Sequence, residues 1–291
     1  MNHSFLIMAH NNPLLLKRIV CKLQKNNHFF FIHVDKKINI NPFKECLQGL
    51  NNVFFIKNRI RVNWGGYSQI QCELLLLRTA FSTSVKMDYF HLISGADYPC
   101  KSNSVFDNYF IEHNGESFMH YDSDEEIRMW RDTKYRNRIQ TWNFVDIFPF
   151  SNKGLSILRQ FIQKAFNLFV KRNLIPNVVA GWNWFSWHRN VVEYVLKYIE
   201  LNPKYLNRFR YTLCCDEVIF HTLLQSKISE LRINRHNSLR YIEWHPKREF
   251  KSLPLILQES EYNDIIKSNS MFCRKVDPKE SLTLLNLLDN V

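Results

Sequence analysis

The sequence predicts an α/β fold built on a mostly parallel, doubly wound central sheet. Two patterns in the first third of the chain lead to this class. Short apolar runs of strand length alternate with longer segments of helical periodicity, and polar turn residues follow the strand-like runs. In sheets of this kind the ligand site lies beyond the carboxyl ends of the strands. The polar residues after each strand are therefore the first candidates for a functional site.

The expected elements follow one another in order. An apolar strand is expected over residues 4–8, and a helix follows it with Asn12 as N-cap and Pro13 at its first position. Apolar residues at helical spacing support this helix. Further strands are expected over residues 29–34, 52–56 and 89–93, with a helix over residues 66–81.

Polar residues after three of these strands fall on one rim of the predicted sheet. His10 and Asn11 follow the first strand, Asp35 follows the second, and Asp97 lies in the turn after the strand over residues 89–93. Each residue taken alone is equally explained by turn formation, but several such turns on one edge favour a ligand site. The chain has only seven glycines and neither a G-x-G-x-x-G motif nor a P-loop. Side chains are therefore expected to hold any phosphate groups.

The second half of the chain is less regular than the first and contains several features of its own. A basic amphipathic helix is expected over residues 152–172, and it either packs on its own domain or lies on an anionic bilayer. An indole cluster over residues 181–187 includes Trp184, a candidate for stacking on a sugar. Asp216 is expected to cap a further helix. Glu217 is then either an acid in the first turn of that helix or a catalytic carboxylate at the edge of a cleft.

Composition and charge limit the functional classes. The 291 residues are 45% hydrophobic, enough for one large domain, and no apolar run reaches the length of a membrane span. The N-terminus lacks the basic region of a secretory signal, so a cytoplasmic location is expected. The net charge of +12 favours an anionic partner. Nucleic acid is not expected, because the cations are spread along the chain without a nucleic-acid-binding motif.

Eight segments in order resemble the core-2/I-branching β-1,6-N-acetylglucosaminyltransferase family, which includes the peptide O-xylosyltransferases. They run from residue 5 to about residue 278: FLIMAHNNPLLLKRIV, FFIHVDKK, VNWGGYSQIQCELLLLRTAF, YFHLISGADYPCKS, GWNWFSWHRNVVEYVLKYI, CCDEVIFHTLL, LRYIEWHP and MFCRKVDP. The resemblance implies a GT-A-type, Rossmann-like nucleotide-sugar transferase fold with a mostly parallel central sheet. It also implies inversion at the anomeric carbon and independence from a divalent metal.

The resemblance further implies roles for particular residues. Glu217 in CCDEVIF matches the general base of the family, and Trp244 in YIEWHP matches an aromatic residue beside the sugar. Lys275 in MFCRKVDP matches a lysine that contacts the donor diphosphate, and a second diphosphate-binding cation falls on or near Lys251. The family tyrosine two places after the tryptophan is replaced by Pro246. This departure leaves the transferred sugar and the acceptor open.

The chemistry of sugar transfer fits these residue types. One carboxylate suffices as the base of an inverting transfer, and either a metal or fixed cations must stabilise the departing diphosphate. Lys275 and Lys251 supply such cations, so no metal or other cofactor is expected. The acidic run Asp122-Ser123-Asp124 is either a metal site or a solvated loop.

Two further sets of residues complete the expected site. Asp35 is expected to bind the uracil or ribose of the donor, and the donor-binding set is His10, Asn11, Asp35, Asp97 and Trp244. Cations for acidic groups and aromatic rings for sugar faces suit an acceptor. The acceptor-binding set is Arg128, Trp130, Arg131 and Trp184.

The predicted function is metal-independent, inverting transfer of N-acetylglucosamine or xylose from a UDP-sugar to a glycan hydroxyl in bacterial surface polysaccharide synthesis. A single domain over residues 1–291 is expected, with a nucleotide-binding half (1–115) and an acceptor-binding and catalytic half (116–291). The acceptor is expected to be lipid-linked, with peripheral contact to an anionic membrane at its inner face through residues 152–172. The alternative is a non-catalytic basic α/β protein that binds a nucleotide sugar or a polyanion. Glu217 together with Lys275 favours the enzyme.

Overall fold

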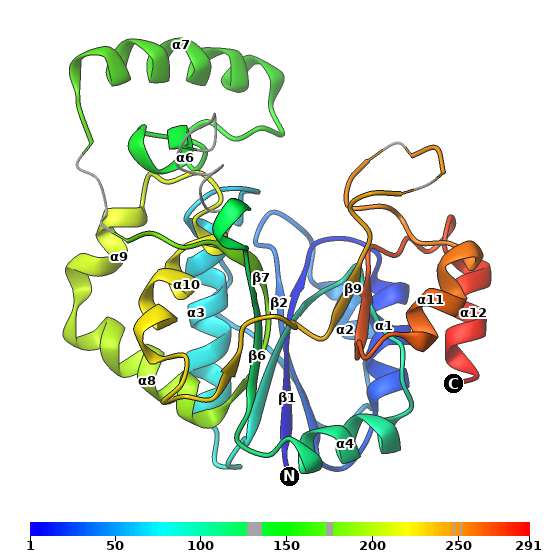
Figure 1. Ribbon diagram of the computed structural model, residues 1–291. Helices are drawn as coiled ribbons and strands as arrows, with labels where there is room; N and C mark the ends of the chain where they lie inside the picture. Colours follow the sequence, from blue (N-terminus) through cyan, green and yellow to red (C-terminus); the bar gives the residue numbers. More distant parts are fainter. Residues whose placement is uncertain (127–135, 173–176, 247, 251) are drawn as a thin grey trace.

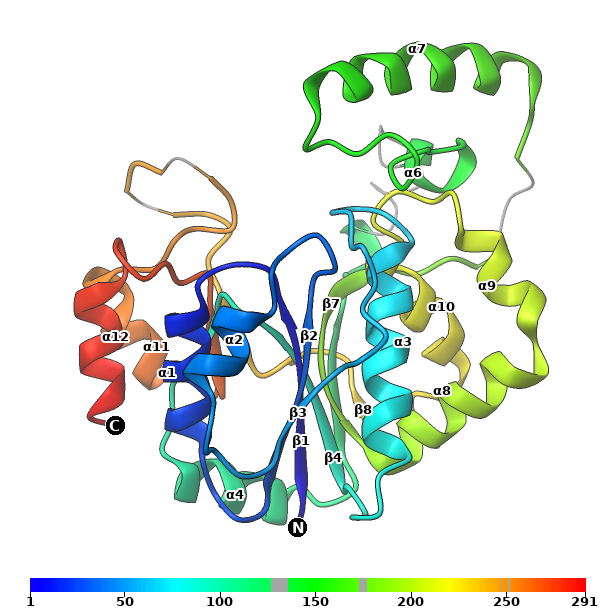
Figure 2. The ribbon, with the colours of Figure 1, turned by 180° about the vertical axis from the view of Figure 1, so that it is seen from behind.

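The computed structural model describes residues 1–126, 136–172, 177–246, 248–250 and 252–291. A seven-stranded sheet with helices on both faces forms its centre, and a three-stranded sheet lies beside it (Figures 1 and 2). The strand order of the large sheet is β3-β2-β1-β4-β7-β6-β8, and only β7 runs against the other strands of this sheet. The predicted α/β class with a mostly parallel sheet is confirmed.

The large sheet draws strands from both halves of the chain. Its strands are β1 (His3–Ala9), β2 (His28–Val34), β3 (Val53–Phe55), β4 (Tyr89–Ser94), β6 (Ser117–Tyr121), β7 (Gly181–His188) and β8 (Ile233–Asn234). The small sheet has the order β5 (Asp97–Pro99), β10 (Phe272–Arg274), β9 (Arg240–Ile242). Strands β1, β2 and β4 are apolar along most of their length because helices cover both faces of the sheet.

Two hydrophobic cores lie on the two faces of the sheet. On β1, Phe5 and Ile7 point into one core and Leu6 into the other, as the two-residue period of a strand requires. The first core includes α1 (Pro13–Leu23), α2 (Asn41–Cys46), α4 (Asn103–Glu112), α11 (Tyr262–Lys267) and α12 (Leu282–Asp289). The second includes α3 (Ser68–Phe81), α8 (Arg189–Leu201), α9 (Pro203–Phe209) and α10 (Ile219–Leu224).

The predicted start of α1 is correct in position and differs in detail. Pro13 occupies the first turn and Asn12 is the N-cap residue, but its side chain makes no capping hydrogen bond. Its backbone is left-handed, with φ of 52°, a conformation that asparagine tolerates better than most residues. Asn12 therefore contributes to the helix through its carbonyl, which accepts from Leu16 N at 3.1 Å, and not through its side chain.

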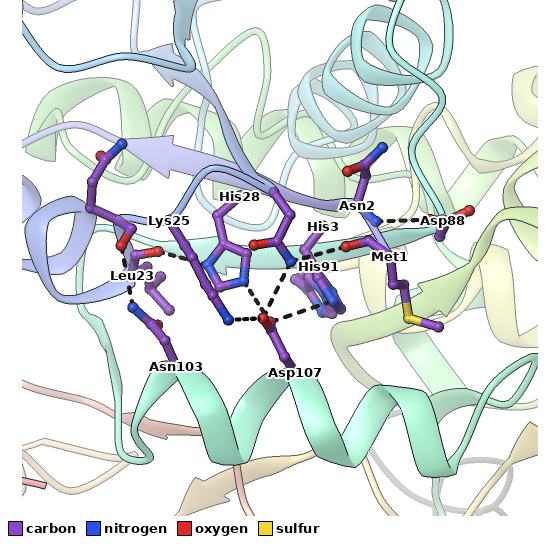
Figure 3. A network of polar contacts seen from close by, with 12 residues as sticks. Met1, Asn2, His3, Leu23, Lys25, His28, Asp88, His91, Asn103 and Asp107 are labelled. Carbon is purple, nitrogen blue, oxygen red and sulfur yellow. Dashed lines mark hydrogen bonds and ion pairs between the residues drawn. The ribbon is translucent and has the colours of Figure 1, made fainter.

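A buried polar network joins the amino ends of β1 and β2 to α4, at the edge opposite the strand carboxyl ends (Figure 3). The Asp107 carboxylate pairs with the Lys25 ammonium group, and its Oδ1 lies 2.8 Å from His28 Nε2. His3 Nδ1 lies 3.1 Å from His91 Nε2. Burial lowers the pKa of His3 to about 3, so this ring is neutral. The network fastens the first strand to the rest of the fold.

Two helices stand outside this core, α6 (Arg136–Gln140) and α7 (Lys153–Phe169). Both views show α7 at the far end of the molecule, away from the sheet and from the chain termini (Figures 1 and 2). The helix expected over residues 152–172 is confirmed but ends earlier, at Phe169, and Asn152 Oδ1 caps its start by accepting a hydrogen bond from Leu155 N at 3.0 Å. No helix in the described ranges is both long and apolar enough to cross a bilayer.

Candidate active site

The carboxyl ends of β1, β2 and β4 meet at one edge of the sheet, as their parallel direction requires. The Asp35 backbone N–H donates to Ala9 O at 2.8 Å, and the Gly95 N–H donates to Met8 O at 3.0 Å. Residues 10–11 directly follow Ala9. The predicted rim residues of the first three turns are therefore neighbours in space.

His10 and Asp35 lie in a mixed electrostatic field on this rim. Asp35 is buried, and its carboxylate accepts a hydrogen bond from Lys37 N at 2.9 Å and lies 3.4 Å from Lys37 Nζ. Partial desolvation lowers the pKa of His10, Lys37 and Lys275 act in the same direction, and Asp35 opposes them. Lys275 thus lies within electrostatic range of the His10 ring.

Lys275 and Trp244 leave the small sheet at the same end. Strands β9 and β10 are parallel neighbours with Arg274 opposite Ile242, so Lys275 and Trp244 follow adjacent strand ends. The indole of Trp244 is partly exposed. The Val276 N–H donates to Ala96 O at 2.9 Å, which joins this end of the small sheet to the turn after β4. Both residues that the resemblance assigned to donor and sugar binding are therefore on the same side as the rim.

Asp97 is fully buried and binds protein groups. Arg274 Nη1 donates to both of its carboxylate oxygens, at 3.1 and 2.9 Å, and Ser94 N donates to Asp97 Oδ2 at 2.6 Å. The Arg274 guanidinium also lies 4.0 Å from the ring centroid of Trp184. One face of this indole is therefore covered by a cation. Asp97 orients the residue before Lys275 and does not present its carboxylate to the rim.

Glu217 lies in a short 3₁₀ turn, Cys215–Glu217, just before α10. The N-cap of α10 is Val218, so the expectation that Asp216 caps this helix is wrong. Asp216 is buried, and its Oδ2 instead accepts hydrogen bonds from Gln69 Nε2 and Asn183 Nδ2, each at 3.1 Å. These donors come from α3 and β7. They fix the turn that carries Glu217 against the central sheet.

The two glycines of the WGG segment support the same turn. Gly65 O accepts a hydrogen bond from Cys214 N at 2.8 Å, while the Gly65 N–H donates to the Gln69 side chain. A Cβ at Gly66 would lie 2.2 Å from Asp146 Oδ1, so a larger residue does not fit there. Gly65 has a φ of +73°, and a Cβ there would lie 3.4 Å from Cys214 Sγ, so the approach of this loop to residue 214 also favours glycine.

Glu217 forms an ion pair with Arg138, whose Nη1 lies 2.7 Å from Glu217 Oε2. Desolvation raises the pKa of Glu217, the neighbouring Asp216 raises it further, and Arg138 opposes both. A carboxyl with a raised pKa is a suitable proton acceptor near neutral pH. Glu73 on α3 is fully buried nearby, and its pKa is raised well above the usual range by burial and by Asp216.

Part of the acidic run after β6 forms a hydrogen-bonded turn. Ser123 N donates to Glu126 Oε2 at 2.7 Å and Glu126 N donates to Ser123 Oγ at 3.2 Å, a reciprocal capping pair. The one group of three metal-type ligands in the described ranges is His3, His28 and Asp107, at the opposite edge of the sheet. Asp107 is there already paired with Lys25 and His28.

Four predicted site residues lie outside the described residues: Lys251, Arg128, Trp130 and Arg131. Four others, not predicted from the sequence, surround the site: Gln69, Arg138, Asn183 and Arg274. Arg274 had a signal, because it directly precedes Lys275 in MFCRKVDP. Nothing in the sequence indicated Arg138, because this residue contacts Glu217 across 79 positions of the chain.

Comparisons with known proteins give relatives over most of the chain. Xylosyltransferase 2 from Pan troglodytes and from Homo sapiens are each 25% identical over 252 residues, covering 84% of this chain and 27% of the relative. Xylosyltransferase sqv-6 from Caenorhabditis briggsae is 24% identical over 290 residues, covering 91% of this chain and 33% of the relative. The chain thus spans about a third or less of the length of these relatives.

Two solved structures also match. The 4-diphosphocytidyl-2C-methyl-D-erythritol synthase of Anaerococcus prevotii has a TM-score of 0.41 at 9% identity, covering 91% of this chain and 94% of that one. A cytidylyltransferase of Leptospira borgpetersenii has a TM-score of 0.37 at 11% identity, covering 81% and 76%. The model of the Core-2/I-Branching enzyme family matches residues 4–266. The chain belongs to the Core-2/I-Branching enzyme family.

Proposed function

We propose that this protein is an inverting glycosyltransferase that moves a sugar from a UDP-sugar to a hydroxyl of a glycan acceptor without a divalent metal. The arrangement of two consecutive residues at the start of β7 carries the proposal. Asn183 holds the turn of Glu217 through Asp216, and Trp184 stacks on Arg274, the residue before Lys275. The residues next to Glu217 and to Lys275, which lie on different elements, both contact this strand end, and this supports a shared role for the two.

The chemical step assigns one role to each group. Glu217 accepts the proton of the acceptor hydroxyl, and the hydroxyl oxygen forms its bond to the anomeric carbon on the face opposite the nucleotide. The bond from that carbon to the diphosphate oxygen breaks, and its electron pair leaves with UDP. Lys275, with Lys251 as a second cation, stabilises the negative charge on the diphosphate in place of a metal.

The remaining predicted residues divide between donor and acceptor. Asp35, with His10 and Asn11 beside it, is assigned to the uracil or ribose of the donor, and Trp244 to the sugar. The acceptor is assigned to Trp184 and to the residues Arg128, Trp130 and Arg131. Asp97 keeps a supporting role, since its carboxylate is occupied by Arg274 and Ser94.

The transferred sugar is assigned to N-acetylglucosamine or xylose. The names of the relatives, xylosyltransferases, support the second sugar, and membership of the branching-enzyme family supports the first. We further propose that the acceptor is a lipid-linked intermediate of a bacterial surface polysaccharide, glycosylated at the cytoplasmic face of the inner membrane.

Release of UDP from a panel of UDP-sugars, with and without glycan acceptors, tests the proposal. Acceptor-dependent release by the wild-type protein, lost in Glu217→Gln while calorimetric UDP binding persists, is the expected result. Binding of UDP-sugars without any turnover across the panel would instead identify a nucleotide-sugar-binding protein. Glu193→Gln is a matched control, because Glu193 lies on α8, outside the proposed site.

A further inference from the structure

Helix α7 turns its polar side toward the protein. Three side chains spaced four residues apart, Arg159, Gln163 and Asn167, bond to backbone atoms of the segment before the helix. Their partners are Phe148 O at 3.0 Å, Phe144 N at 2.9 Å and Trp142 N at 2.7 Å, respectively. Arg159 is buried, and its guanidinium lies 3.8 Å from the ring centroid of Phe150. The stripe that would face water on an ordinary surface helix is thus the one that anchors α7.

The opposite side of α7 is apolar and faces solvent. Its large apolar side chains are between 36% and 84% exposed: Ile157, Leu158, Phe161, Ile162, Leu168 and Phe169. The ribbon shows this helix as the outermost element of the molecule, and no helix or strand of the described residues covers it (Figures 1 and 2). Apolar surface of this kind, gathered on one helix, marks an interaction surface rather than ordinary scattered exposure.

The charge around α7 is of one sign. Residues 147–192 contain no Asp or Glu, while Lys153 and Lys164 lie on the helix and Lys171 just beyond it. Lys153 and Lys164 are 11 residues apart, three helical turns, so they share one edge of the apolar face. An apolar face with a lysine edge is the pattern of a helix that lies in the interface of an anionic bilayer.

A basic groove continues from the carboxyl end of α7. It is lined by Trp142, Lys171, Arg172, Asn207, Arg208, Arg210 and Tyr211. Both Nη atoms of Arg208 are buried, and the described residues offer them no hydrogen-bond partner. Burial and the nearby Arg208 lower the pKa of Arg172 to about 10. The Arg172 guanidinium donates to the backbone oxygens of Thr141, Tyr211 and Arg208, so of the two groups only that of Arg208 lacks partners among the described residues. The positive charge of these two neighbouring guanidinium groups favours an anion, such as a phosphate, at this groove.

We propose that α7 docks this protein on the surface of an anionic lipid bilayer, with its apolar face among the upper acyl chains and its lysine edge against the headgroup phosphates. A second copy of the chain is the less suitable occupant. A symmetric contact between two α7 helices would bring identical lysines together, and each copy carries a net charge of +12. Docking places the enzyme on the same membrane surface as a lipid-linked acceptor. The docking proposal itself does not rest on the proposed reaction.

Vesicle co-sedimentation tests the docking, with phosphatidylcholine vesicles compared with mixed phosphatidylcholine and phosphatidylglycerol vesicles. The wild-type protein is expected to bind the mixed vesicles and to dissociate at high salt. Leu168→Asp should weaken this partitioning about tenfold or more, since burial of one leucine contributes that much. Leu201→Asp on α8 is the matched control, because Leu201 is 69% exposed and Leu168 is 66% exposed. Lys153→Gln and Lys164→Gln should each weaken binding about fivefold.

Three results would overturn the docking. The first is equal binding of the wild type to both kinds of vesicle, and the second is unchanged vesicle binding of Leu168→Asp. The third is a wild-type protein that binds no vesicles but forms a dimer, while Leu168→Asp is a monomer. Turnover with a water-soluble acceptor, together with thermal unfolding, is measured on the same variants and should match the wild type. A protein that releases UDP but does not bind vesicles would refute the docking alone. A chain that binds vesicles but never releases UDP removes the proposed reaction alone.

Discussion

The ion pair between Arg138 and Glu217 makes the pH dependence of the proposed reaction testable. A base acts only in its deprotonated form, so turnover should rise with pH through the pKa of Glu217. Desolvation and Asp216 raise that pKa, and Arg138 lowers it. Removal of the guanidinium in Arg138→Ala should therefore raise the pKa further. The acidic limb of the pH profile should then move to higher pH.

The size of this shift follows from the geometry. A hydrogen bond to a charged partner contributes roughly 1.5–3 kcal/mol when buried. The Glu217 side chain is 36% exposed and that of Arg138 is 23% exposed, so solvent screening reduces the contribution. We therefore expect the ion pair to contribute about 1 kcal/mol. Its loss in Arg138→Ala should raise the pKa of Glu217, and move the acidic limb, by somewhat less than about one pH unit.

The assay is kcat/KM for UDP release across pH with saturating acceptor, on the wild type, Arg138→Ala and Arg138→Lys. The lysine variant keeps a positive charge and should recover part of the shift. The limb should lie highest in Arg138→Ala and lowest in the wild type. An acidic limb that stays in place in Arg138→Ala, or that moves to lower pH, would refute the assignment of Glu217 as the titrating base.

Further predictions follow from the same structure. Glu217→Gln should lower turnover by about two to four orders of magnitude while calorimetric UDP binding stays close to that of the wild type. Lys275→Ala should lower kcat more than it weakens donor binding, because charge on the diphosphate develops in the transition state. Lys275→Arg should recover part of the rate. Unchanged kinetics in Lys275→Ala would remove this lysine from the mechanism. EDTA should leave activity intact, whereas loss that Mn²⁺ restores would make Asp122 and Asp124 the leading metal ligands. Asp107→Asn should lower the free energy of unfolding by roughly 1–3 kcal/mol at neutral pH. Lys25 and His28 lower the pKa of Asp107 against the opposing effect of desolvation. The stability that this carboxylate contributes is therefore present above its unfolded pKa and is lost as pH falls through its lowered folded pKa. Denaturant melts of both proteins at neutral and acidic pH should show the difference shrink, and a constant difference would contradict this origin.

The strands of the first third were predictable because their pattern is local. The run over residues 89–93 corresponds to Tyr89–Ser94, and the run over residues 29–34 to His28–Val34. Helices on both faces make such strands continuously apolar, a signal that each segment carries by itself. The indole cluster over residues 181–187 was not predicted as a strand, although it forms β7 in the middle of the sheet. Its mixed burial, set by partners on β4 and β6, follows from long-range pairing.

Sequence by itself determined the fold class, the rim at the strand ends and the family resemblance, because these depend on periodicity, on strand direction and on ordered short motifs. Tertiary structure alone decided which charged groups meet. Glu217 pairs with Arg138 across 79 positions, and Arg274 pairs with Asp97 across 177. It also decided which way α7 faces. Amphipathicity shows that a helix has an apolar side, but the backbone groups of residues 142–148 that bind Arg159, Gln163 and Asn167 turn that side outward, and their positions are set only when the chain has folded.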